Sequence, residues 1–139
     1  MRIPYCIKKP YTSLIVNMSD EQQYIRITKG EIGPDGELHE IITMMQTIDN
    51  RRNHRDIRSN IQNSSEYQTL KYPGHNYQLS EAQMQKFRQA YATKDRVPNP
   101  GFLGWDTSDS SLISNRYYTW TPTQRKIGKH YYFTATPNR

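Results

Sequence analysis

The residues with the clearest chemistry are aromatic and basic side chains in the last quarter of the chain. Between residues 115 and 136, two runs rich in tyrosine and threonine flank a basic turn with Arg125, Lys126 and Lys129. From Ser110 onward there are five basic residues and no acidic residue. Aromatic rings stack on the bases of single-stranded nucleic acid, while cations bind its phosphates. This combination predicts a nucleic-acid-binding hairpin.

Strand geometry divides the side chains of this hairpin between two faces, because alternate residues of a strand point to the same side. We expect the more apolar set to face the core: Tyr118, Trp120, Tyr131 and Phe133. The other face and the basic turn then supply the expected binding residues: Arg116, Tyr117, Arg125, Lys126, Lys129, His130 and Tyr132. A pair of strands stabilised only by cross-strand aromatic contacts is the structural alternative.

A second basic cluster lies in the segment 49–61, and its arginines are Arg51, Arg52, Arg55 and Arg58. If this segment is helical, the arginines at 51, 55 and 58 share one face, because residues three and four apart are neighbours on a helix. We expect all four to join the nucleic-acid site, provided that the fold brings them to the side of the hairpin. A solvated helix surface is the alternative.

Cofactor and metal chemistry find no support in the residue spacing. The chain contains neither a phosphate-binding glycine loop nor a dinucleotide fingerprint. His39 and Glu40 begin like a zinc-protease motif, but Thr43 stands where the second histidine is needed. Cys6 is the one cysteine, so an internal disulfide is excluded. We therefore expect no cofactor and no metal.

One enzymatic hypothesis is left, a metal-independent ribonuclease. Such an enzyme needs a general base, a general acid and cations that stabilise the charge on the phosphorane. The residues of suitable type are His54, His75, His130, Glu40 and Glu66. Their spacing does not indicate that they converge, so we expect a protein without enzymatic activity.

The segment 80–94 has the strongest helix pattern in the sequence. Ser80 and Gln83 match a capping box, and apolar residues recur at helical spacing after them. Earlier in the chain, 23–32 alternates apolar and polar residues with the two-residue period of a strand. The turn at 33–36 then predicts a hairpin, whose second strand gives way to helix near Thr43.

These elements predict an α+β fold in one domain, residues 1–139. We expect a small antiparallel sheet, formed by the N-terminal and C-terminal hairpins and packed by one or two helices. Residues 1–10 contain two prolines and two lysines and are expected to form an extended arm. Residues 98–114 are expected to form a long loop.

Composition and charge indicate which partners to expect. The net charge is +6, which favours nucleic acid, single-stranded by preference, or an acidic protein surface. Hydrophobic residues are only 34%, and eleven tyrosines are typical of a surface that binds a partner. An assembly or inhibitor subunit, such as a virion component or a phage-type inhibitor of host machinery, is therefore the alternative function. It would act by protein–protein contact, as a homo-oligomer or in a larger assembly.

The sequence also bears on location. No apolar stretch approaches the length of about 20 residues that spans a bilayer, and the N-terminus does not resemble a signal peptide. We expect no membrane contact and a cytoplasmic protein, intracellular or, for a viral protein, in the virion.

Overall fold

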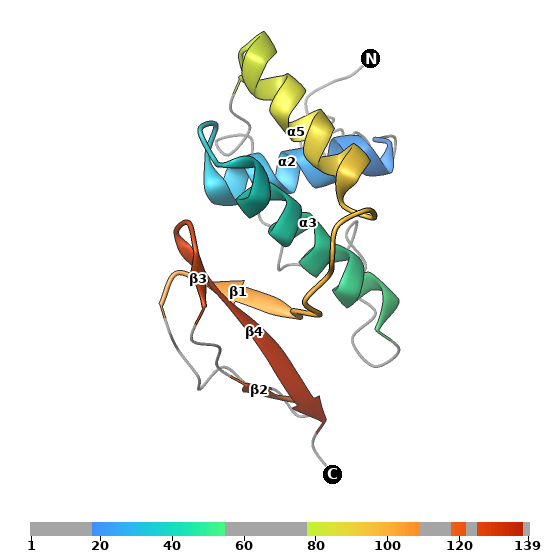
Figure 1. The fold of residues 1–139 in the computed structure, drawn as a ribbon, viewed down its shortest axis with the longest axis vertical. Helices are drawn as coiled ribbons and strands as arrows, with labels where there is room; N and C mark the ends of the chain where they lie inside the picture. The colour runs from blue at the N-terminus through green and yellow to red at the C-terminus, as the bar shows by residue number, and fades with distance from the viewer. Residues whose placement is uncertain (1–17, 55–77, 109–117, 122–124, 138–139) are drawn as a thin grey trace, which may run out of the picture.

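The computed structural model describes residues 18–54, 78–108, 118–121 and 125–137. In these ranges, helices form one layer and antiparallel strands form a second layer below α3 (Figure 1). The predicted α+β class is therefore confirmed, while the expected arm at 1–10 lies outside the described residues. The elements in chain order are α2 Asp20–Ile32, α3 Leu38–Asn53, α5 Glu81–Thr93, β1 Gly104–Asp106, β2 Tyr118–Thr121, β3 Lys126–Ile127 and β4 His130–Pro137.

The predicted N-terminal hairpin is wrong, because both of its expected strands are helices. Ser19 and Gln22 form a capping box at the start of α2, and Gly33, with φ of 97°, follows its last residue. Residues 23–29 of this helix are all buried. The alternation that suggested a strand therefore marks no solvent face, and the turn at 33–36 joins two helices.

Helix α3 also replaces the strand that was expected before Thr43. Its buried apolar residues are Ile41, Met44, Met45 and Ile48, which follow the helical period. The N-terminus carries a second reciprocal cap, in which the backbone N–H of Glu37 donates to Glu40 Oε1 at 3.3 Å. Helical spacing and this cap outweigh the β-branched residues of the segment.

Helix α5 confirms the prediction from its cap. Ser80 and Gln83 form the expected box, and Phe87 and Ala90 are buried in the core. Beyond its last turn, Gln46 of α3 donates through Nε2 to the carbonyl of Lys94 at 3.0 Å. The end of α5 is thereby fixed to the middle of α3.

The sheet is organised around β4, which pairs antiparallel with the other three strands. The C-terminal hairpin is confirmed: Thr121 of β2 lies opposite Thr134 of β4, and the two-residue strand β3 pairs with β4 next to the turn. Strand β1 pairs with β4 in the order β1-β4-β2. Because β1 lies inside 98–114, part of the expected loop is a strand; residues 109–114 are outside the described residues.

Both faces of β4 carry buried side chains. On one face, Tyr132 packs into the core that the three helices form. On the other face, Phe133 packs with Leu103 and Trp120 in a second, smaller cluster. The central strand therefore presents little open surface along residues 130–133.

Candidate nucleic-acid interface

The turn between β3 and β4 gathers exposed cations around one aromatic ring. Arg125, Lys126 and Lys129 are exposed, and Tyr131 is half-buried. Lys126 Nζ lies 5.3 Å from the centre of the Tyr131 ring, a cation–π contact across the two strands. From here on, the name basic turn covers four residues: the cations Arg125, Lys126 and Lys129, and Tyr131 at the start of β4. Together they offer positive charge and part of one aromatic surface to an anionic ligand.

Glu40 holds the basic turn against the first turn of α3. Its side chain is 4% exposed, and its Oε2 accepts a hydrogen bond from the backbone N–H of Lys129 at 3.3 Å. Gly128 has φ of 61°, and a Cβ at this position would lie 1.7 Å from the same oxygen. The turn therefore needs glycine both for its backbone conformation and for its contact with Glu40. Sequence patterns gave Gly128 no role and suggested Glu40 only as a candidate catalytic carboxylate.

A shallow pocket of about 210 Å³ lies beside this contact, between the turn at 33–36 and the basic turn. Glu40 and Lys129 line it together with Asp35. The side chain of Glu40 is already used by two backbone N–H groups, and Asp35 accepts a hydrogen bond from Gln83. The pocket is therefore better explained as a gap left where the two turns pack together than as a ligand site.

His130 and Tyr132 do not face outward as predicted. His130 is 3% exposed and Tyr132 is fully buried, and their side of β4 faces the helices. The inward prediction for Trp120 and Phe133 is confirmed, whereas Tyr131, which was also expected to face the core, is only half-buried. Sequence alternation assigns one wet face to a strand, whereas here both faces are covered. Neither His130 nor Tyr132 can stack on a base in this arrangement.

The polar atoms of these two residues are incompletely paired. Within the part of the chain that the structure describes, His130 Nδ1 and Tyr132 Oη have no hydrogen-bond partner. Burial lowers the pKa of His130, although the carboxylates of Glu31 and Glu40 act in the opposite direction. Burial raises the pKa of Tyr132, and the same carboxylates add to that increase. Both side chains are therefore held in their neutral forms.

Arg51 is a structural residue rather than a contact for nucleic acid. It is 9% exposed, and Nη1 donates to the carbonyl of Leu103 at 2.5 Å. Its guanidinium also lies 5.8 Å from the centre of the Trp120 ring. These contacts join α3 to the segment that leads into β1. The prediction that Arg51 binds nucleic acid is therefore corrected.

Arg52 is more exposed but is engaged within the helical layer. Its Nη1 lies 3.5 Å from Asp20 and donates to the hydroxyl of Tyr24 at 3.2 Å. Arg52 is twelve residues beyond Glu40, which corresponds to about 18 Å along α3. The structure thus does not bring Arg51 and Arg52 to the basic turn. The remaining predicted residues, Arg55, Arg58, Arg116 and Tyr117, lie outside the described ranges.

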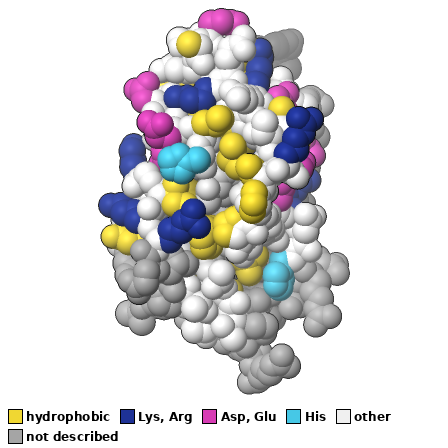
Figure 2. Space-filling view, in the orientation of Figure 1, with side chains coloured by type: hydrophobic (Ala, Val, Ile, Leu, Met, Phe, Trp, Pro, Cys, Tyr) yellow, Lys and Arg dark blue, Asp and Glu magenta, His cyan; other side chains and the backbone are white. Residues whose placement is uncertain are grey.

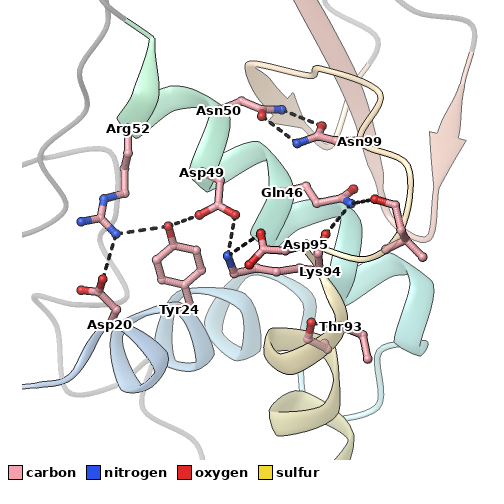
Figure 3. A network of polar contacts seen from close by, with 12 residues as sticks. Asp20, Tyr24, Gln46, Asp49, Asn50, Arg52, Thr93, Lys94, Asp95 and Asn99 are labelled. Carbon is pink, nitrogen blue, oxygen red and sulfur yellow. Dashed lines mark hydrogen bonds and ion pairs between the residues drawn. The ribbon is translucent and has the colours of Figure 1, made fainter.

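A polar network joins the three helices at this distant end (Figure 3). Tyr24 Oη donates to Asp49 at 2.5 Å, and Lys94 Nζ lies 2.6 Å from the other oxygen of Asp49. Lys94 also lies 3.3 Å from Asp95. We use the name helix network for six residues: Asp20, Tyr24, Asp49, Arg52, Lys94 and Asp95. It links α2, α3 and α5 through charged groups that all have partners.

The pKa directions in the helix network show how tightly its groups are paired. Burial alone would lower the pKa of Lys94, but hydrogen bonds and charge from Asp49 and Asp95 outweigh it and raise the pKa. The pKa of Tyr24 is raised by burial and by its hydrogen bond to Asp49. Lys94 is thus charged and Tyr24 neutral at physiological pH, as a structural network requires.

For the ribonuclease hypothesis, the structure brings one candidate carboxylate near one candidate histidine but does not bring a second histidine to them. Glu40 lies in the first turn of α3 and acts electrostatically on His130. His54 follows the last residue of the same helix, about 21 Å from Glu40 along the axis. The two candidate histidines within the described ranges, His54 and His130, are therefore at different ends of α3, while His75 and Glu66 lie outside those ranges.

Charge in the described residues is nearly balanced. These ranges hold 11 of the 19 basic residues and 10 of the 13 acidic residues, so they carry +1 of the net +6. Figure 2 shows basic and acidic side chains interspersed around a band of hydrophobic ones on one face of the molecule. Among the described residues, the basic turn is thus a local concentration of positive charge.

Within the described ranges, histidine, cysteine and carboxylate side chains form no group of three that could hold a metal ion. None of the described helices is long and apolar enough to cross a bilayer. Comparison with known proteins adds no family, because the chain matches no family model, no curated protein and no solved structure.

Proposed function

We propose that this chain is a non-enzymatic nucleic-acid-binding protein that contacts phosphates through the basic turn. The observation that carries the proposal is the exposure of Arg125, Lys126 and Lys129 on a turn that Glu40 holds in place. The hairpin segment 125–137 contains no acidic residue. Because the backbone of this turn is already held, binding orders only the side chains, which favours this site over a flexible basic segment.

Tyr131 gives the proposed site its preference for single strands. Its half-buried ring leaves one surface, which Lys126 covers in the absence of ligand. A base of a single strand can stack there once Lys126 moves to a neighbouring phosphate, whereas the bases of a duplex are enclosed in the helix. Stacking of one base contributes about 1–3 kcal/mol. We expect phosphate contacts to give most of the affinity and Tyr131 to give a modest preference for single strands.

Charge reversal at the turn tests whether nucleic acid binds at this site or is attracted only by the net positive charge of the protein. Binding of a labelled single-stranded 20-mer is measured by fluorescence anisotropy for Lys126→Glu/Lys129→Glu. The matched control is Arg88→Glu/Arg96→Glu, which changes the net charge equally at exposed positions on and just after α5. In Figure 1, α5 lies on the far side of α3 from the sheet.

We expect the turn variant to lose affinity at least about tenfold and the control variant to lose about twofold or less, because phosphate contacts act over short distances. Equal losses in both variants would show that net charge, rather than the basic turn, determines binding. Undiminished binding by the turn variant would also contradict the proposal.

An assembly or inhibitor subunit that binds an acidic protein surface is the second candidate. One observation favours it: the half-buried Asp106 lies opposite Tyr131 on the other edge of β4, so the cations have a carboxylate nearby. Mixed charge of this kind suits a protein partner better than a polyanion. Size-exclusion chromatography with light scattering, with and without the oligonucleotide, separates the two. If the protein binds another protein, we expect self-association or a complex with that protein. We then expect no complex with the oligonucleotide.

A further inference from the structure

The hairpin meets the helices through a small, partly buried polar junction. Its members come from four elements: Glu31 of α2, Glu40 of α3, Trp105 of β1, and His130 and Tyr132 of β4. Trp105 Nε1 donates to Glu31 at 3.0 Å, and Lys129 donates its backbone N–H to Glu40. We call these five residues the junction.

His130 is the group of the junction that acid would charge, and one of its two ring nitrogens is unsatisfied within the described ranges. It is 3% exposed, and its Nδ1 has no hydrogen-bond partner among the described residues. The charged and titratable groups that act on it are Glu31 of α2, Glu40 of α3, Asp106 of β1 and Lys129 of the turn. The ring of Tyr132, on the same face of β4, is 6.5 Å away. A proton on this imidazole would create a buried charge that no hydrogen bond to Nδ1 compensates.

We propose that the junction is an acid-sensitive latch, in which protonation of His130 releases the basic turn from the first turn of α3. A buried imidazolium has two ways to lower its free energy. It can move into water with the adjoining residues of the turn, or it can draw the carboxylate of Glu40 toward itself. Both movements break the hydrogen bond between Glu40 and the N–H of Lys129. This inference concerns the protein without ligand and does not depend on the proposed nucleic-acid binding.

The direction of the pKa of His130 supports the same conclusion and sets the pH range. Burial lowers this pKa below its ordinary value of about 6.5, against the pull of Glu31 and Glu40. The latch is therefore closed at neutral pH and opens only in more acidic solution. Ordinary carboxyl groups titrate near pH 4, so a variant without the imidazole is needed to assign a transition in acid to His130.

Nuclear magnetic resonance of the full chain tests the latch directly. The backbone N–H of Lys129, the indole N–H of Trp105 and the ring protons of His130 are followed from pH 8 to pH 4.8. We expect all three to change together with one midpoint below 6.5, and the exchange protection of the Lys129 amide to fall at least about tenfold. The change should vanish in His130→Gln and persist in His39→Gln, which alters an exposed histidine of α3.

Three results would overturn the proposal. One is a His130 ring that titrates at or above 6.5, since it would then be hydrated or already paired. Another is an unchanged transition of Lys129 and Trp105 in His130→Gln, which would assign it to the carboxylates. The third is a Lys129 amide that keeps its protection while His130 titrates. If His130→Gln does not fold, the ring titration in the natural sequence, read against Lys129, still decides between these outcomes.

Discussion

The helix network and the junction are both partly buried polar clusters that join several elements, yet they are paired very differently. In the helix network, the hydroxyl of Tyr24 donates to Asp49, and Lys94 is paired with two carboxylates. In the junction, Tyr132 Oη and His130 Nδ1 lack partners within the described ranges. Paired networks stabilise one arrangement, whereas unpaired buried groups lower the cost of leaving it. From this difference we expect the helix network to keep one arrangement and the junction to respond to pH.

The largest effect is expected at Asp49, because it joins two partners in the helix network. Asp49→Ala leaves the ammonium of Lys94, 9% exposed, with the exposed Asp95 as its remaining carboxylate. We expect the free energy of unfolding to fall by about 3 kcal/mol, measured by chemical denaturation. The control Asp95→Ala removes a carboxylate that is 79% exposed and should cost less than about 1 kcal/mol. Equal costs would contradict the account of the network.

A glycine pair measures how strongly the basic turn is held. Gly128→Ala places a methyl group against Glu40 at a positive φ, and we expect it to cost about 2–3 kcal/mol of unfolding free energy. Gly101 also has positive φ, 82°, but a Cβ there would meet nothing within 4 Å. Gly101→Ala should therefore cost only the backbone strain, about 1 kcal/mol. Similar values for both variants would show that the contact with Glu40 is unimportant.

The hydroxyls of two buried tyrosines, one paired and one unpaired in the described part of the chain, allow the two clusters to be compared by the same substitution. Tyr24→Phe removes a hydroxyl with a carboxylate partner, and we expect a loss of about 1–1.5 kcal/mol in unfolding free energy. Tyr132→Phe removes a buried hydroxyl that lacks a partner among the described residues, so we expect no loss or a gain of up to about 1 kcal/mol. Thermal unfolding of the two variants side by side is the measurement. A clear loss in Tyr132→Phe would mean that this hydroxyl is satisfied in solution.

The smallest effect expected is a change in the pH dependence of stability. Because the folded state lowers the pKa of His130, the unfolded chain binds a proton that the folded chain does not. The titration of His130 therefore has no effect on the free energy of unfolding above about pH 6.5. Below that pH the free energy of unfolding declines until the lowered pKa is reached. His130→Gln should flatten this decline, while His39→Gln should keep it. An unchanged decline in His130→Gln would assign it to other groups.

Local patterns predicted part of this structure. The capping box at Ser80 and Gln83 identified α5, and two-residue alternation identified the C-terminal hairpin and the inward position of Phe133. The same reasoning could have found α2, because Ser19 and Gln22 repeat that cap. In 23–32 the two-residue alternation favours a strand, but the cap is the stronger indicator.

Tertiary contacts decided the rest. The partner of Arg51 is the carbonyl of Leu103, 52 residues away, and local spacing does not encode such a contact. His130 is buried because the helices cover a face of β4 that the sequence would leave in water. The candidate site that could be predicted was therefore the set of exposed cations, Arg125, Lys126 and Lys129. Its attachment through Glu40 and Gly128 could not.

The central claim is that the basic turn binds the phosphates of nucleic acid, and the salt dependence of binding tests it most directly. The logarithm of the association constant for a single-stranded 20-mer is plotted against the logarithm of salt concentration. Each phosphate contact adds a slope of about −0.7. The account predicts a negative slope that becomes shallower by about 1.4 in Lys126→Glu/Lys129→Glu and is unchanged in Arg88→Glu/Arg96→Glu. A slope near zero in the natural sequence, or an unchanged slope in the turn variant, would contradict it.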